Sequence, residues 1–234
     1  MTTITTHLDT DSASMTPSAA PQTLTRSSKA LAVRRGLLVA MPVLAGVFLV
    51  VGAVADPAAG ISGARMNEIY IDNPDALQWK STGYHWAYAF LIAPAMLLAS
   101  YVRGRGAWIA NVAAVLGFLG ATTLPGMLMS DWYVAGIGHF YGLEGTTAVE
   151  DHMFATMWGI KGFIVPGMLG FALALPLATV ALWRARLVRW WAFAALLGAY
   201  AAFFVSGARA WGTVISLVLL CVFAVAIAKA TKEA

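Results

Sequence analysis

Six long apolar stretches constrain this chain more than any other feature of its sequence. Each is about 20 residues long, which as a helix matches the roughly 30 Å hydrocarbon core of a bilayer. They are continuous runs of Ala, Leu and Val, whereas a membrane barrel strand alternates apolar and polar residues over about ten positions. The predicted transmembrane helices cover residues 36–54, 84–102, 107–129, 163–182, 190–206 and 211–228.

The composition agrees with a chain that lies in lipid. Hydrophobic residues make up 60% of the 234 residues and charged residues 11%, whereas a soluble domain is nearer half apolar and a quarter charged. Helices satisfy every backbone N–H and C=O within the segment, as lipid requires. We therefore predict an all-α integral membrane protein, a bundle of six transmembrane helices. Two long, partly ordered exterior loops would cover residues 55–83 and 130–162.

Basic residues concentrate at one end of the predicted helices. With the N-terminus inside, the inner segments carry eleven Lys and Arg residues, and the outer segments carry only Arg65, Lys80, Lys161 and Arg209. The positive-inside rule then places both termini in the cytoplasm and the protein in the cytoplasmic membrane. Because the bases lie at helix ends, where they set topology, we expect no nucleic-acid binding despite a pI near 9.4.

The first 30 residues differ in composition from the rest of the chain. They are rich in Thr, Ser, Ala and Pro, so they cannot bury enough apolar surface to offset their ordering entropy. We predict a disordered cytoplasmic tail over residues 1–30 and a transmembrane domain over residues 31–234. Ala53-Val54-Ala55 resembles a signal-peptide cleavage site, but we expect an uncleaved helix, because the first apolar run is longer than the apolar region of a signal peptide and 35 residues precede it.

Two local patterns make further structural predictions. Ala113, Gly117 and Ala121 recur at every fourth position of the third predicted helix, and such a stripe of small residues is typical of a close helix–helix contact. Thr147 and Glu150 have the spacing of a capping box, which predicts a short helix that begins near Ala148 inside the second exterior loop.

Three histidines on the exterior side, His85, His139 and His152, are the main candidates for chemistry. Imidazole is the commonest metal ligand and titrates near neutral pH. With carboxylates it would bind zinc or iron, with the nearby methionine thioethers copper, and two histidines on different helices would ligate a haem. The carboxylates available as partners are Asp131, Glu144, Glu150 and Asp151.

The spacing of these histidines also admits other roles. No His-x-x-x-His or His-Glu-x-x-His motif sets two ligands on one helix face. Three separate interfacial histidines, or a proton relay, are the alternatives to a metal or haem site. Lys161, at the outer edge of the fourth predicted span, is a further candidate, because ionisable residues in membranes are often functional. It would otherwise extend to the headgroups or pair with Asp131, Glu150 or Asp151.

No sequence motif identifies a reaction. The chain has no Walker A, Gly-x-Ser-x-Gly, Cys-x-x-Cys or dinucleotide pattern, and its predicted spans lack the carboxylates of an ion-coupled transporter. We expect an accessory subunit, or a small-ligand or partner-binding protein, that acts through an extracytoplasmic cap. Its partners would be the lipid bilayer and other membrane subunits. The alternative is a membrane oxidoreductase, or a metal- or haem-dependent enzyme, that uses the three histidines at the outer face.

Overall fold

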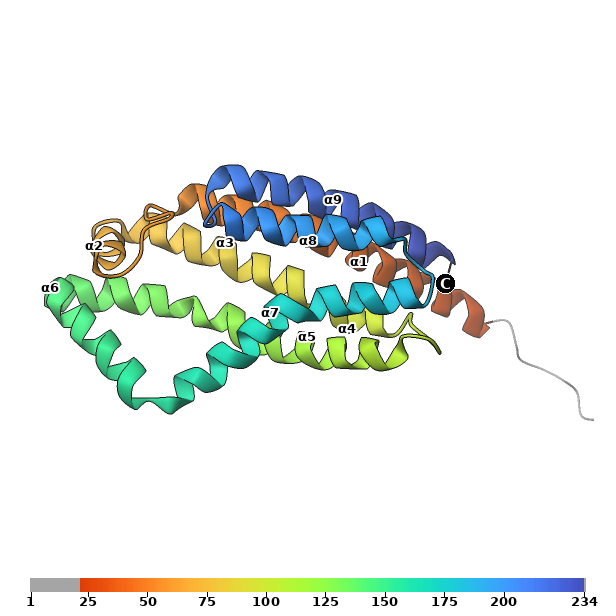
Figure 1. Ribbon diagram of the computed structural model, residues 1–234, viewed down its shortest axis with the longest axis horizontal. Coiled ribbons are helices and arrows are strands. Elements are labelled where there is room, and N and C mark those ends of the chain that lie inside the picture. The colour runs from red at the N-terminus through yellow and green to blue at the C-terminus, as the bar shows by residue number, and fades with distance from the viewer. Residues whose placement is uncertain (1–21, 234) are drawn as a thin grey trace, which may run out of the picture. The chain divides into compact units, whose positions relative to one another are not determined.

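The computed structural model describes residues 22–233, and the regular structure among them is entirely helical (Figure 1). This confirms the all-α prediction. Residues 1–21 of the predicted tail lie outside the described residues. The chain divides into two units at Val33, and the helical contacts below belong to the unit that begins at Arg34. The helices are α1 (Gln22–Ala55), α2 (Ala64–Asp72), α3 (Pro74–Ile92), α4 (Pro94–Ala99), α5 (Ala107–Met127), α6 (Met129–Thr156), α7 (Trp158–Arg184), α8 (Trp190–Val205) and α9 (Ala210–Glu233).

Within residues 22–233, four helical stretches are long and apolar enough to cross a membrane: Lys29–Ala55, Ala107–Thr156, Trp158–Arg184 and Ala210–Lys232. They support the prediction of a transmembrane protein. The other two predicted spans take different forms. Residues 84–102 are divided between α3 and α4, because Pro94 has no backbone N–H to continue the helix. Helix α8 is apolar but only 16 residues long.

Among helices α2 to α9, α5 and α7 make the most extensive contact. They cross at two glycines, where a Cβ added to Gly120 would lie 2.8 Å from the Cα of Gly170. The predicted stripe of small residues on α5 is also a contact. Ala113 is fully buried, and a Cβ added to Gly117 would lie 3.3 Å from Ala95 of α4. The prediction of a close contact along this stripe is confirmed.

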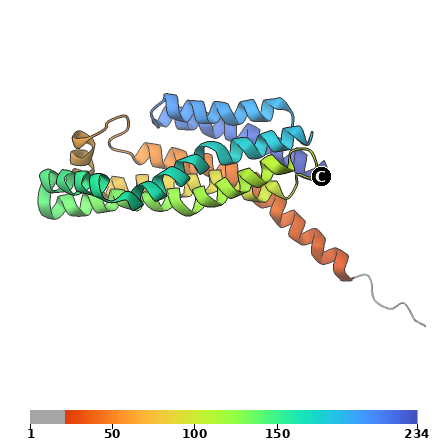
Figure 2. The same cartoon turned by 60° about the horizontal axis from the view of Figure 1, so that its bottom comes forward.

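Aromatic side chains fill the bundle between α3, α7 and α8. The ring centroids of Tyr88 and Phe171 are 5.0 Å apart, and the Tyr200 hydroxyl donates a hydrogen bond to the Phe171 carbonyl at 2.8 Å. Helices α8 and α9 lie side by side in both views (Figures 1 and 2). The Ser216 hydroxyl of α9 ties this pair together by donating to the Ala199 carbonyl at 2.8 Å.

The two segments expected as exterior loops contain helices. Residues 55–83 hold α2 and the first half of α3, and residues 130–162 hold most of α6 and the start of α7. Gly142 interrupts α6 with φ 69° and ψ −174°, a conformation that is essentially restricted to glycine. The chain reverses there, so α6 consists of two segments, residues 129–141 and 143–156 (Figure 1).

The predicted capping box at Thr147 is wrong. The Thr147 hydroxyl donates to the Leu143 carbonyl at 3.0 Å, as a serine or threonine inside a helix commonly does. The helix therefore already includes Leu143, because Gly142 sets where the second segment starts.

Candidate functional site

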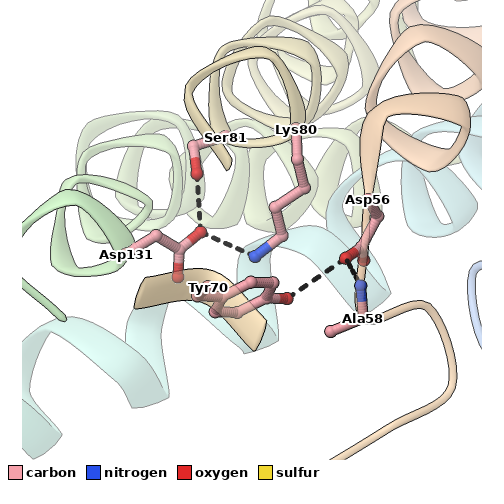
Figure 3. Close-up of polar contacts among 6 residues, drawn as sticks. All are labelled: Asp56, Ala58, Tyr70, Lys80, Ser81 and Asp131. Carbon is pink, nitrogen blue, oxygen red and sulfur yellow. Dashed lines mark hydrogen bonds and ion pairs between the residues drawn. The ribbon is translucent and has the colours of Figure 1, made fainter. Parts of the chain in front are cut away.

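A buried ion pair joins α3 to α6 (Figure 3). The Nζ atom of Lys80 lies 2.7 Å from Oδ2 of Asp131, and the two side chains are 10% and 18% exposed. The Ser81 hydroxyl donates to the same carboxylate oxygen at 2.7 Å. Asp131 lies in the first turn of α6, where the helix dipole also stabilises a negative charge. Two successive residues of α3 thus fix the start of α6.

Tyr70 of α2 covers this ion pair and connects it to the chain after α1 (Figure 3). The Lys80 Nζ lies 4.6 Å from the centroid of the Tyr70 ring, within the range of a cation–π interaction. The Tyr70 hydroxyl donates to Oδ1 of Asp56 at 3.3 Å, and the Ala58 N–H donates to the same oxygen at 3.0 Å. Four segments of the chain therefore meet in one polar network. We call α2, the first half of α3 (residues 74–83) and α6 the cap.

The raised pKa values of Lys80 and Tyr70 keep the lysine charged and the tyrosine neutral at neutral pH. Burial alone would lower the pKa of Lys80, but the charge and hydrogen bond of Asp131, aided by Tyr70, raise the pKa above its ordinary value of 10.5. Burial raises the pKa of Tyr70 above 10.0. Neither group titrates near pH 7, where a general acid or base is most effective. The network is suited to holding helices together.

A second polar contact joins α2 to the returning segment of α6. The Asn67 side-chain amide donates to Oε2 of Glu150 at 2.6 Å, between residues 83 positions apart in the chain. Asn67 is only 4% exposed. A hydrogen bond to a charged acceptor contributes more than one between neutral groups, so this contact holds the two segments of the cap together.

Replacing Asn67 by Ala should loosen α2 without unfolding the bundle. The expected cost is about 1.5–3 kcal/mol, the range for a hydrogen bond to a charged group. Hydrogen exchange should rise in residues 64–72 and 143–150, while exchange in α5 and α7 stays unchanged. Glu150→Gln keeps an acceptor oxygen and should have a smaller effect. Equal exchange in Asn67→Ala and the wild type would contradict this role.

The three histidines take separate positions. The Nδ1 atom of His85 lies 3.0 Å from the Pro125 carbonyl, so Nδ1 carries a proton and donates. His139 and His152 are exposed on the two segments of α6, before and after Gly142. Among residues 22–233 no three His, Cys, Asp or Glu side chains form a group that could hold a metal ion. The geometry does not support the predicted shared metal site.

The four candidate carboxylates and Lys161 do not form one cluster either. Asp131 pairs with Lys80 and Glu150 accepts from Asn67, whereas Glu144 and Asp151 are exposed. Lys161 is exposed and forms no ion pair with the part of the chain that the structure describes. Sequence reasoning treated Lys80 only as a topology residue. A single lysine in a segment rich in acidic residues is a sign that it forms an ion pair. The sequence does not indicate the partner, because Asp131 is 51 positions away and no periodicity links the two residues.

The outward face of the first α6 segment is aromatic. Trp132, Tyr133, Phe140 and Tyr141 are 43%, 65%, 78% and 74% exposed, whereas Val134 and Gly138 of the same segment are buried. The buried side packs against α2 and α3. We call these four exposed residues the aromatic face. It is held by a helix whose first turn is fixed through Asp131.

Comparison of the chain with protein-family models, with curated proteins and with solved structures finds no match.

Proposed function

We propose that the protein crosses the cytoplasmic membrane six times, keeps both termini in the cytoplasm, and binds a protein partner through a cap on the outer side. The Lys and Arg distribution supports this orientation. In this topology α3 and α4 together make one crossing. Helix α8, which with 16 residues extends about 24 Å, makes another with its ends in the interfacial zones.

The aromatic face is the observation that carries the proposal. Helix α5 has 21 residues, so its length of about 32 Å accounts for a whole bilayer core. The first α6 segment continues onward from the end of α5 (Figure 1), which supports a position beyond the lipid. Exposed aromatic side chains gathered on one helix outside the bilayer are typical of a protein–protein interface, and Trp and Tyr are prominent among the residues that dominate the binding energy of such interfaces.

The charges around the cap indicate the chemistry of the partner. Asp72, Asp75, Glu144 and Asp151 are exposed, and none forms an ion pair with residues 29–232, whose side chains are described. The ion-paired network leaves Lys80 unavailable to a partner. We therefore expect a partner surface that is apolar at its centre and basic at its rim, because complementary charge steers association. An accessory subunit of a larger membrane assembly fits this description.

Replacing both Tyr133 and Phe140 by Ala should weaken partner binding by at least tenfold, since interface hot spots contribute about 2 kcal/mol or more each. The midpoint of thermal unfolding should stay the same, because both side chains are largely exposed. A photo-crosslinking amino acid at Tyr133, in cells of the native host, should give one discrete protein adduct that disappears in Phe140→Ala.

The matched control places the same photo-crosslinker at Val218 of α9. This residue is 58% exposed but lies within a predicted span, so it should yield lipid adducts only. Lipid adducts alone at Tyr133 as well would contradict the proposed partner and indicate that the aromatic face lies in the membrane.

A further inference from the structure

A groove lies between residues 35–44 of α1 and residues 228–232 of α9. Its volume is about 510 Å³, within the range of small-ligand sites. Its walls are apolar except at one end, where two bases and a threonine stand. The lining residues used below are Arg35, Val39, Val43 and Leu44 of α1, and Thr231 and Lys232 of α9.

Arg35 lines this groove and has a hydrogen-bond donor with no acceptor among the described residues. The donor is the Nε atom, which is buried, and leaving a buried charged donor unpaired is costly. The neighbouring Arg34 is accounted for, since its guanidinium lies 5.7 Å from the centroid of the Tyr101 ring. Among residues 29–232, whose side chains the structure describes, no acidic residue lines the groove. An anion from outside the chain is an acceptor that suits Arg35, because guanidinium N–H groups donate readily to anionic oxygens.

The position of the groove relative to the predicted spans identifies the class of anion. Arg35 immediately precedes the span at residues 36–54, and Lys232 follows the span at residues 211–228. Both bases are thus at headgroup depth, while Val39, Val43 and Leu44 continue the groove to acyl-chain depth. Guanidinium groups match phosphate geometry well, and basic pockets between membrane helices are typical sites for anionic headgroups.

We propose that this groove binds an anionic phospholipid, with its phosphate held by Arg35 and Lys232 and one acyl chain along Val39, Val43 and Leu44. The site lies at the end of the bundle where the bases gather, so the lipid belongs to the leaflet that the proposed topology makes cytoplasmic. It is independent of the cap and of the partner proposed there.

Native mass spectrometry of the full chain in detergent tests this site. Added phosphatidylglycerol should bind at least fivefold more tightly than phosphatidylcholine, since each base near a membrane surface contributes about that factor. Arg35→Gln and Lys232→Gln should each reduce phosphatidylglycerol binding by about fivefold. Arg184→Gln is the matched control, because Arg184 is an exposed base at the end of α7 that does not line the groove.

Two further measurements make the result decisive. Inorganic phosphate in excess should not displace phosphatidylglycerol, because it lacks the acyl chain; displacement would show a site for phosphate alone and overturn the proposal. Ala40 also lines the groove, so Ala40→Trp should block it and reduce phosphatidylglycerol binding while keeping both bases. Thermal unfolding in phosphatidylcholine confirms that each variant is folded. Equal binding of the two lipids, or an equal loss in Arg184→Gln, would also overturn it.

Discussion

Replacing Asp131 by Ala should lower the free energy of unfolding by about 3 kcal/mol or more, the largest effect expected of a polar substitution in this chain. The substitution leaves the ammonium of Lys80, whose side chain is 10% exposed, without its carboxylate, and it also removes the acceptor of Ser81. An unpaired buried charge is costlier than no charge at all. Titration with SDS in mixed micelles, followed by helicity, measures the change.

The double variant Lys80→Met with Asp131→Leu separates charge pairing from packing. Replacing both charges with apolar side chains of similar size should recover most of the stability, since a buried ion pair is often no more stabilising than its apolar equivalent. Lys80→Met alone should lie between the two. If the double variant is as unstable as Asp131→Ala, the network stabilises the cap by its geometry and not by charge compensation.

The pH dependence follows from the raised pKa of Lys80. Because the folded state favours the ammonium more than the unfolded state does, this group contributes its full stability below its ordinary pKa of 10.5, and the contribution is lost as the pH rises through the folded-state value. Above pH 10.5, the free energy of unfolding of the wild type should therefore fall more steeply with pH than that of the double variant, which carries no lysine at this position.

Replacing Gly170 by Leu should destabilise the bundle by about 3 kcal/mol, at the upper end of overpacking effects. The atoms that a Cβ at Gly170 would meet belong to the backbone of α5, at Gly120 and Leu116. Backbone atoms cannot rotate aside as a side chain can, so α5 and α7 would have to separate along their whole contact. Thermal unfolding in detergent measures the loss.

Gly126→Leu is the control for this prediction, because Gly126 lies on α5 and an added Cβ there has no neighbour within 4 Å. It should be neutral or slightly stabilising, since leucine favours a helix over glycine by roughly 0.5–1 kcal/mol. If Gly170→Leu were equally neutral, the two helices would not cross as closely as the structure shows.

The helical content and the membrane environment could be predicted because they depend on local properties of the sequence. A run of about 20 apolar residues is long enough to cross lipid whatever its neighbours are, and residues 36–54 and 163–182 lie within long apolar helices. The stripe at Ala113 and Gly117 is similar, since helical periodicity alone puts small residues on one face. Pro94 was visible in the sequence, but its division of residues 84–102 into α3 and α4 was not predicted.

The candidate site could not be predicted in the same way. The histidines were selected for their chemistry, but the fold places His139 and His152 on opposite sides of the turn at Gly142. The contacts that hold the cap join Lys80 to Asp131 and Asn67 to Glu150, pairs separated by 51 and 83 positions. No periodicity links residues that far apart, so only the packing of α2, α3 and α6 brings them together.

The sequence by itself thus determined the membrane environment of this protein, its long apolar helices and the end of the bundle at which basic residues gather, because each depends on hydrophobicity or charge summed over one segment. Only the tertiary structure decided which charges are paired and which remain available. It pairs Asp131 with Lys80 and leaves the Nε of Arg35 without an acceptor among residues 29–232, whose side chains are described. The physical reason is that burial and pairing are properties of neighbours in space, and helix packing sets those neighbours.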